Sequence, residues 1–174
     1  MIDILKAAFP QIEANKYLET LTDSVFCIYD QNTEPKRCFI QNDLEGIVHF
    51  TVHNPTGREI HFLAIDRGVI SELDDMERCD CAVFDQKTFC FIEIKVVVDK
   101  QVGVSNRKAK SQLRATIIHF REKMVFTTKR IEAYICVGAT APRPARLARD
   151  LNERYEFEEE LGVALYHGNE KRFA

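Results

Sequence analysis

The stretch between residues 79 and 95 constrains the fold most, because two apolar runs there flank a short polar turn at residues 85–88. This pattern is typical of a β-hairpin with a short loop. If the turn is symmetric, Phe84 lies opposite Phe89, and the residues before Phe84 pair in step with those after Phe89. The sequence therefore predicts an antiparallel hairpin in this register.

The same register brings three charged side chains together. Asp80 lies opposite Glu93, and Lys95 shares their face because strand side chains alternate. Opposed residues have Cβ atoms about 4.5–5.5 Å apart, so the two carboxylates repel each other. A hard cation such as Mg²⁺, or Mn²⁺ in its place, would remove that repulsion. We therefore expect Asp80 and Glu93 to bind a metal ion, and Lys95 to orient a water or neutralise a phosphate.

A helix and another strand follow the hairpin. Apolar residues recur at helical spacing from Arg107 to about Met124 and form one stripe: Ala109, Leu113, Ile117, Phe120 and Met124. Residues 131–138 then have the pattern of a strand. A strand–helix–strand unit implies that its two strands run parallel.

The start of this helix is basic. Its cations are Arg107, Lys108, Lys110 and Arg114. Free N–H groups at a helix N-terminus also favour phosphate. A solvated basic face is the structural alternative. Beside a pair of carboxylates these four side chains suit a phosphodiester, so we expect them to contact nucleic acid.

The remaining segments predict an α/β protein with a mixed sheet and flanking helices. Helices are expected at residues 3–20, with Pro10 dividing or kinking the segment, and at 147–160. Strands are expected at 25–29, 46–52, 58–65 and 162–167. A single domain is expected, with its core at about 58–140, an N-terminal extension at 1–57 and a C-terminal helix and strand at 141–174.

Composition narrows the class of protein. The 174 residues suit one domain with a sizeable core. No apolar run approaches the roughly 18 residues of a membrane span, and the first residues do not have the pattern of a signal peptide. We therefore expect a cytoplasmic protein with no membrane association. The net charge of −3 argues against a strongly basic, non-specific nucleic-acid binder and leaves room for a local basic surface.

Cysteines and histidines offer weaker metal sites. No CxxC pair occurs among the six cysteines, Cys27, Cys38, Cys79, Cys81, Cys90 and Cys136. Buried thiols are therefore favoured over a zinc site, and nothing indicates a disulfide framework. A hairpin could bring His49 near His61, but no third ligand is evident. Scattered surface histidines, His53 included, are the favoured interpretation.

Asp80, followed on the next strand by Glu93-Ile94-Lys95, resembles the signature of the PD-(D/E)XK nuclease superfamily. The resemblance covers about residues 58–140. It implies a restriction-endonuclease-like core of three antiparallel strands, a crossover helix and a parallel strand. It also implies that Mg²⁺ binds Asp80, Glu93 and the backbone carbonyl of Ile94, and that Lys95 positions or helps activate the attacking water. Gln112 matches the polar residue that such nucleases often carry on the crossover helix, where it would orient the helix or, with Lys108, contact a phosphate.

The chain departs from the pattern of this superfamily in two places. Cys79 stands where many members have proline. Many members also add a glutamate from their first core helix to the metal site, and no residue here clearly matches it. The candidates are Glu13, Glu19 and Glu72. Glu72 and Asp75 also lie in the acidic segment that leads to Asp80, so either carboxylate could reach the site.

Three functions therefore stay open. The first is an active metal-dependent endo- or exonuclease acting on nucleic acid, with DNA as the expected substrate. The second is an inactive nuclease-like module that binds nucleic acid or a partner protein. The third is a small α/β protein in which Glu93 and Lys95 are a structural ion pair. The resemblance also suggests a homodimer or a larger nucleic-acid-processing complex.

Overall fold

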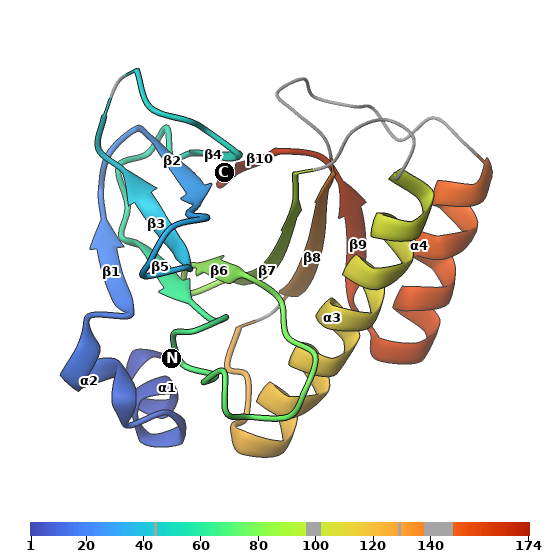
Figure 1. Ribbon diagram of the computed structural model, residues 1–174, viewed down its shortest axis with the longest axis horizontal. Helices are drawn as coiled ribbons and strands as arrows, with labels where there is room; N and C mark the ends of the chain where they lie inside the picture. Colours follow the sequence, from blue (N-terminus) through green and yellow to red (C-terminus); the bar gives the residue numbers. More distant parts are fainter. Residues whose placement is uncertain (44, 97–101, 129, 138–147) are drawn as a thin grey trace.

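Two β-sheets and the helices around them form the structure, a computed structural model that describes residues 1–43, 45–96, 102–128, 130–137 and 148–174 (Figure 1). The helices are α1 (Ile2–Ala8), α2 (Gln11–Asn15), α3 (Val102–Lys123) and α4 (Ala148–Leu161). The six-stranded sheet contains, in spatial order, β1 (Leu18–Leu21), β5 (Ile60–Ala64), β6 (Cys81–Phe84), β7 (Thr88–Lys95), β8 (Arg130–Val137) and β9 (Ala164–His167). The four-stranded sheet contains β10 (Glu170–Arg172), β4 (Phe50–His53), β2 (Val25–Asp30) and β3 (Cys38–Gln41).

The centre of the larger sheet has the predicted topology. Strands β5, β6 and β7 are antiparallel neighbours, α3 crosses over, and β8 pairs with β7 in parallel. Strand β9 then pairs with β8, also in parallel. The expected mixed α/β fold is confirmed, including three antiparallel strands, a crossover helix and a parallel strand.

The β6–β7 hairpin has the predicted register, with Phe84 opposite Phe89. The Asp85 N–H donates to the Thr88 carbonyl at 3.0 Å, and Asp85 Oδ1 accepts from the N–H groups of Lys87 and Thr88 at 2.8 and 2.7 Å. An aspartate that satisfies several turn N–H groups holds the loop in one conformation. This turn fixes the register of the two strands that carry the site.

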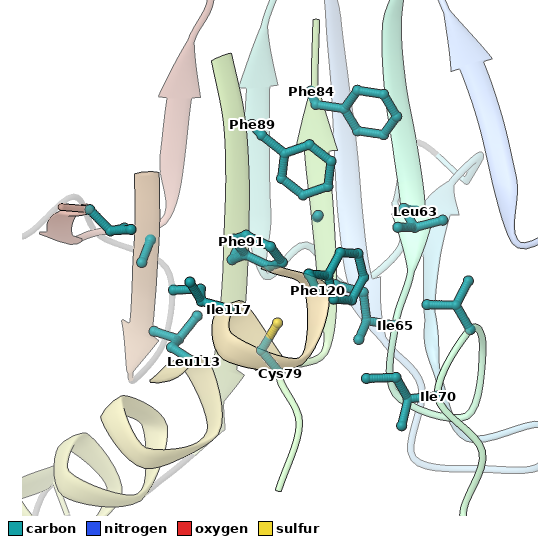
Figure 2. Packing of buried hydrophobic residues seen from close by; sticks show 14 of the residues in the cluster. Leu63, Ile65, Ile70, Cys79, Phe84, Phe89, Phe91, Leu113, Ile117 and Phe120 are labelled. Carbon is teal, nitrogen blue, oxygen red and sulfur yellow. The ribbon is translucent and has the colours of Figure 1, made fainter. Parts of the chain in front are cut away.

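Aromatic packing holds this hairpin against α3 (Figure 2). The rings of Phe84 and Phe89 stack with centroids 4.7 Å apart, and Phe91 meets Phe120 of α3 edge to face at 5.3 Å. Such pairs contribute about 0.5–1.5 kcal/mol each beyond the area that they bury. The other face of the hairpin packs against the four-stranded sheet, where buried side chains of both sheets form a second core cluster. The helices and the smaller sheet thus cover opposite faces of the larger sheet.

The N-terminal segment differs from the single predicted helix at residues 3–20. It divides after Ala8 into two short helices, and Pro10 is the N-cap of α2, in agreement with the predicted division. Lys16 then adopts a left-handed conformation with φ of 53° and ends α2. Residues 18–21 form β1, which pairs with β5. The prediction of helix at 18–20 was wrong because a left-handed lysine carries no glycine signal for the end of a helix.

The other differences are at strand ends and sheet edges. The strand expected at 46–52 begins only at Phe50, and β3 and β10 were not predicted. These two edge strands have four and three residues, too few for an alternating pattern to stand out. In the described ranges, no helix is both long enough and apolar enough to span a membrane.

Candidate functional site

The three predicted side chains meet where β6 begins and β7 ends. Asp80 directly precedes β6, and its Oδ2 accepts the N–H of Ile94 at 2.5 Å. Lys95 Nζ forms an ion pair with Glu93 Oε1. Alternation places Glu93 on the α3 face of the sheet, because Phe91 packs toward α3 in the same strand. Asp80 and Lys95 lie at the ends of the strands, where both also interact with Asp30 of the smaller sheet. The structure therefore brings the predicted constellation together.

Burial makes these carboxylates hard to ionise. Glu93 has no exposed surface; Lys95 pairs with its Oε1, and its Oε2 has no hydrogen-bond donor among the residues that the structure describes. Burial, reinforced by repulsion from Asp80, raises the pKa of Glu93 well above its usual value, although Lys95 opposes this. Burial also raises the pKa of Asp80 to about 7. Both carboxyl groups therefore bind protons more tightly than ordinary surface carboxylates do.

The pKa of Lys95 is raised as well, and for this side chain that favours the charged form. Its side chain is 20% exposed. Burial alone would lower the pKa of Lys95, but attraction by Glu93, Asp80 and Asp30 outweighs burial and raises it. Lys95 is therefore a cation throughout the neutral range.

Two further aspartates affect the pKa of Asp80. Asp30, at the end of β2 in the smaller sheet, and Asp66, just beyond β5, both raise the pKa of Asp80, after burial as the main cause. The Asp66 N–H donates to the backbone carbonyl of Asp80 at 3.1 Å, and its carboxylate accepts from Arg78 Nε. Sequence reasoning missed both aspartates. The sequence could have indicated Asp66, because this residue follows the strand that pairs with the strand after Asp80. No sequence pattern pointed to Asp30.

The three glutamates considered for the missing helix residue lie elsewhere, and so does Asp75. Glu13 forms an ion pair with Lys6 at 3.2 Å, and Glu72 forms one with Arg67. Glu19 is exposed in β1, and Asp75 is exposed in the loop before β6. Within the described residues, none of the four contacts Asp80 or Glu93.

Helix α3 anchors the chain just before Asp80. Gln112 Nε2 donates to the Arg78 carbonyl at 2.8 Å, and the Cys79 N–H donates to Thr116 Oγ1 at 2.7 Å. Thr116 is fully buried. Gln112 thus orients the segment that carries Asp80, one of the roles expected for it, while Thr116 was not predicted. Thr116 lies one helical turn after Gln112, on the same face of α3, and this spacing could have indicated its role.

Replacing Thr116 with valine should lower the free energy of unfolding by about 1–3 kcal/mol, because the buried Cys79 N–H loses its acceptor while side-chain volume is retained. Urea unfolding measures this change. Thr127→Val, at an exposed position beyond α3, is the matched control and should be nearly neutral. Equal stability of Thr116→Val and the wild type would show that this hydrogen bond does not hold the segment.

The four predicted basic residues separate into two pairs. Arg107 and Lys108 are exposed near the start of α3. Lys110 forms an ion pair with Glu153 of α4 at 2.8 Å, and Arg114 forms one with Glu160. Contact with nucleic acid stays a prediction for all four, and Arg107 and Lys108 are the two with exposed side chains and no ion pair among the described residues.

The histidines have separate partners. His49 Nδ1 accepts the N–H of Asp30 at 2.9 Å, and His61 Nδ1 lies 2.8 Å from Thr20 Oγ1. His53 lies 3.4 Å from a carboxylate oxygen of Glu170. All six cysteines are free thiols, and five of them are buried. The expectation of buried thiols without disulfides is confirmed for those five; Cys27 is half-buried.

A pocket of about 510 Å³ opens beside Lys95, between the two sheets. Its lining comes from residues 29–33, 47–49 and 94–96 and from Cys136. Lys95 belongs both to this pocket and to the ion pair with Glu93, so the charged site forms part of the pocket wall.

In the described residues, no three His, Cys, Asp or Glu side chains gather closely enough to hold a metal ion in their present positions. The donor chemistry nevertheless fits Mg²⁺. Adjacent carboxylates are the ligands that this ion prefers. The buried Oε2 of Glu93, which has no hydrogen-bond donor among the described residues, is suited to accept a cation.

Comparison of the chain with protein-family models, with curated proteins and with solved structures finds no match, so any assignment of function depends on the geometry described above.

Proposed function

We propose that this protein hydrolyses phosphodiester bonds in nucleic acid, DNA in the first instance, at a metal-dependent site formed by Asp80, Glu93 and Lys95. The observation that carries the proposal is the burial of two neighbouring carboxylates, Asp80 and Glu93, beside the cationic side chain of Lys95. Burying such groups costs several kcal/mol per ion. Groups perturbed in this way are concentrated at functional sites.

Asp80 and Glu93 would hold Mg²⁺ through their carboxylates, with the backbone carbonyl of Ile94 as a further ligand. When bound, the ion supplies Lewis-acid activation of the phosphate and lowers the pKa of water. Lys95 remains protonated, so it acts as a cation that neutralises the phosphate and orients water, and it does not serve as a general base. Gln112 and Thr116 position Asp80 through the backbone that they hold.

The test is a cleavage assay on single- and double-stranded DNA and RNA with Mg²⁺, with Mn²⁺ and with chelator. Glu93→Gln keeps the shape of the side chain and removes its charge, so cleavage should fall by about a hundredfold or more. Glu122→Gln, at an exposed position of α3, is the control and should retain activity. Cleavage that resists chelator, or that survives Glu93→Gln at the wild-type rate, would refute this mechanism.

One observation favours the inactive nuclease-like module as a second candidate. The Glu93 carboxylate already has the Lys95 ammonium as a partner, and a metal ion would have to compete with that ion pair. Calorimetric titration with Mn²⁺ separates the two candidates. Binding that is lost in Asp80→Asn supports a metal site, whereas absence of binding together with absence of cleavage supports the module.

A further inference from the structure

The pocket beside Lys95 lies at the C-terminal ends of two parallel strands. Ile94 and Lys95 of β7, with Val96 just after them, form part of its wall, and Cys136 contributes from β8. The C-terminal ends of these strands lie at the edge of the molecule where α3 begins (Figure 1). In sheets with parallel strands, this edge is where ligands commonly bind.

The opposite wall comes from the smaller sheet and is held firmly. The Cys136 thiol donates to the carbonyl of His49 at 3.1 Å and so ties the segment before β4 to β8. The His49 N–H donates to the carbonyl of Ile28 at 3.0 Å. Gln31 Nε2 donates to the carbonyls of Thr33 and Pro35, each at 3.1 Å, and shapes the loop after β2. These bonds make the pocket a preformed feature.

The lining combines apolar walls with a few directed polar groups. Ile47, Val48 and Ile94 are apolar residues of the lining, and Tyr29 contributes to it from β2. His49 Nδ1 accepts the Asp30 N–H, so a neutral ring carries its proton on Nε2 and offers a donor there. Burial lowers the pKa of His49 and keeps the ring neutral, while burial raises the pKa of the Asp30 carboxyl.

A planar ring with donors and acceptors on its edge matches this lining, and a phosphate attached to it matches Lys95. The volume of about 510 Å³ falls within the range of about 300–1,000 Å³ that is typical of small-molecule sites. Among the described residues, the lining contains one acidic residue, Asp30, and one lysine, Lys95. A single lysine can neutralise one phosphate, whereas Asp30 would repel the additional charge of a di- or triphosphate.

We infer that this pocket binds the base and sugar of one unpaired nucleotide whose phosphate contacts Lys95. The inference rests on the proposed function, because it makes this nucleotide the neighbour of the bond to be cleaved. A base that is paired and stacked in a duplex cannot enter the pocket, and unpairing it costs a few kcal/mol. The preferred substrate is therefore a single strand or an unpaired end.

The experiment measures binding without turnover. Deoxynucleoside 5′-monophosphates contain no phosphodiester bond, so their affinity is measured by calorimetry with Mg²⁺ present and again with chelator. Deoxyribose 5-phosphate, which lacks the base, is the comparison ligand. We expect at least one of the four nucleotides to bind about tenfold or more tightly than deoxyribose 5-phosphate.

Ile47→Glu places a charge at a pocket residue that is 69% exposed, so the fold should tolerate it. It should weaken nucleotide binding by about tenfold or more. Val125→Glu, at a position that is 77% exposed outside the pocket, should leave binding unchanged. Equal affinity for ligands with and without a base, or unchanged binding in Ile47→Glu, would overturn the inference.

Cleavage assays distinguish failure of this inference from failure of the proposed function. Nucleotide binding that depends on Ile47, without cleavage of any nucleic acid, would leave the pocket assigned and refute the nuclease. Metal-dependent cleavage at equal rates on single strands and duplexes, unaffected by Ile47→Glu, would support the nuclease and refute the pocket.

Discussion

Replacing Lys95 with alanine should lower metal-dependent cleavage by about a hundredfold or more and leave the fold intact. The loss follows because in the proposed mechanism Lys95 is the cation that neutralises the phosphate, and removing one such preorganised group typically costs about 10²–10³ in rate. The fold should survive because β7 keeps its pairing with β8 through the backbone. Loss of Lys95 removes the partner that opposes the effect of burial, so the pKa of Glu93 should rise further.

Lys87→Ala is the matched control for this variant. Lys87 lies in the turn of the same hairpin, at the end remote from the site, and it is exposed. It should retain wild-type cleavage. The measurement is the cleavage rate at saturating Mg²⁺, with circular dichroism to check the fold. Cleavage by Lys95→Ala at the wild-type rate would remove Lys95 from the mechanism.

Replacing Asp80 with asparagine should stabilise the metal-free protein at pH 8 and abolish its stabilisation by Mg²⁺ or Mn²⁺. The pKa of Asp80 rises from 3.8 to about 7 on folding, mainly through burial. Between these values the folded state binds more protons than the unfolded state, so the free energy of unfolding falls as pH rises. At about 1.36 kcal/mol for each pKa unit, the loss amounts to about 4 kcal/mol above pH 7.

Asparagine avoids this loss because it carries no charge, and its amide oxygen can still accept the Ile94 N–H. The stability advantage of Asp80→Asn should therefore be greatest above pH 7 and should disappear toward pH 4. Urea unfolding at pH 5 and pH 8, with and without metal, measures both effects. Asp75→Asn, at an exposed residue five positions earlier, should show neither. If Asp80→Asn were less stable than the wild type at pH 8, the buried charge of Asp80 would not be destabilising, and the prediction would be wrong.

Local pattern predicted the hairpin and its surroundings well. The polar turn at residues 85–88 set the register, and the register placed Asp80 beside Glu93-Ile94-Lys95 before any tertiary contact was known. The crossover helix and the parallel pairing of β7 with β8 followed from one apolar stripe and one strong strand. These features depend on neighbours in sequence, which periodicity reports directly.

The rest of the site depends on contacts between distant segments. Asp30 belongs to the second sheet, which the sequence did not separate from the first, and its influence on Asp80 spans fifty positions. The pocket wall formed by residues 47–49 lies where a strand was expected. Lys110 and Arg114 showed a basic pattern, but only the packing of α3 against α4 reveals their ion pairs.

The interface between the two sheets contains its own reporter of conformational opening. Cys38, Cys81, Cys90 and Cys136 lie in the buried cluster between the sheets, whereas Cys27 is half-buried. A thiol reagent reaches a buried cysteine only when the structure around it opens. The rate at which these four thiols become modified would therefore measure how often the sheets separate, without any added label. A ligand in the pocket that bridges the sheets would slow that modification.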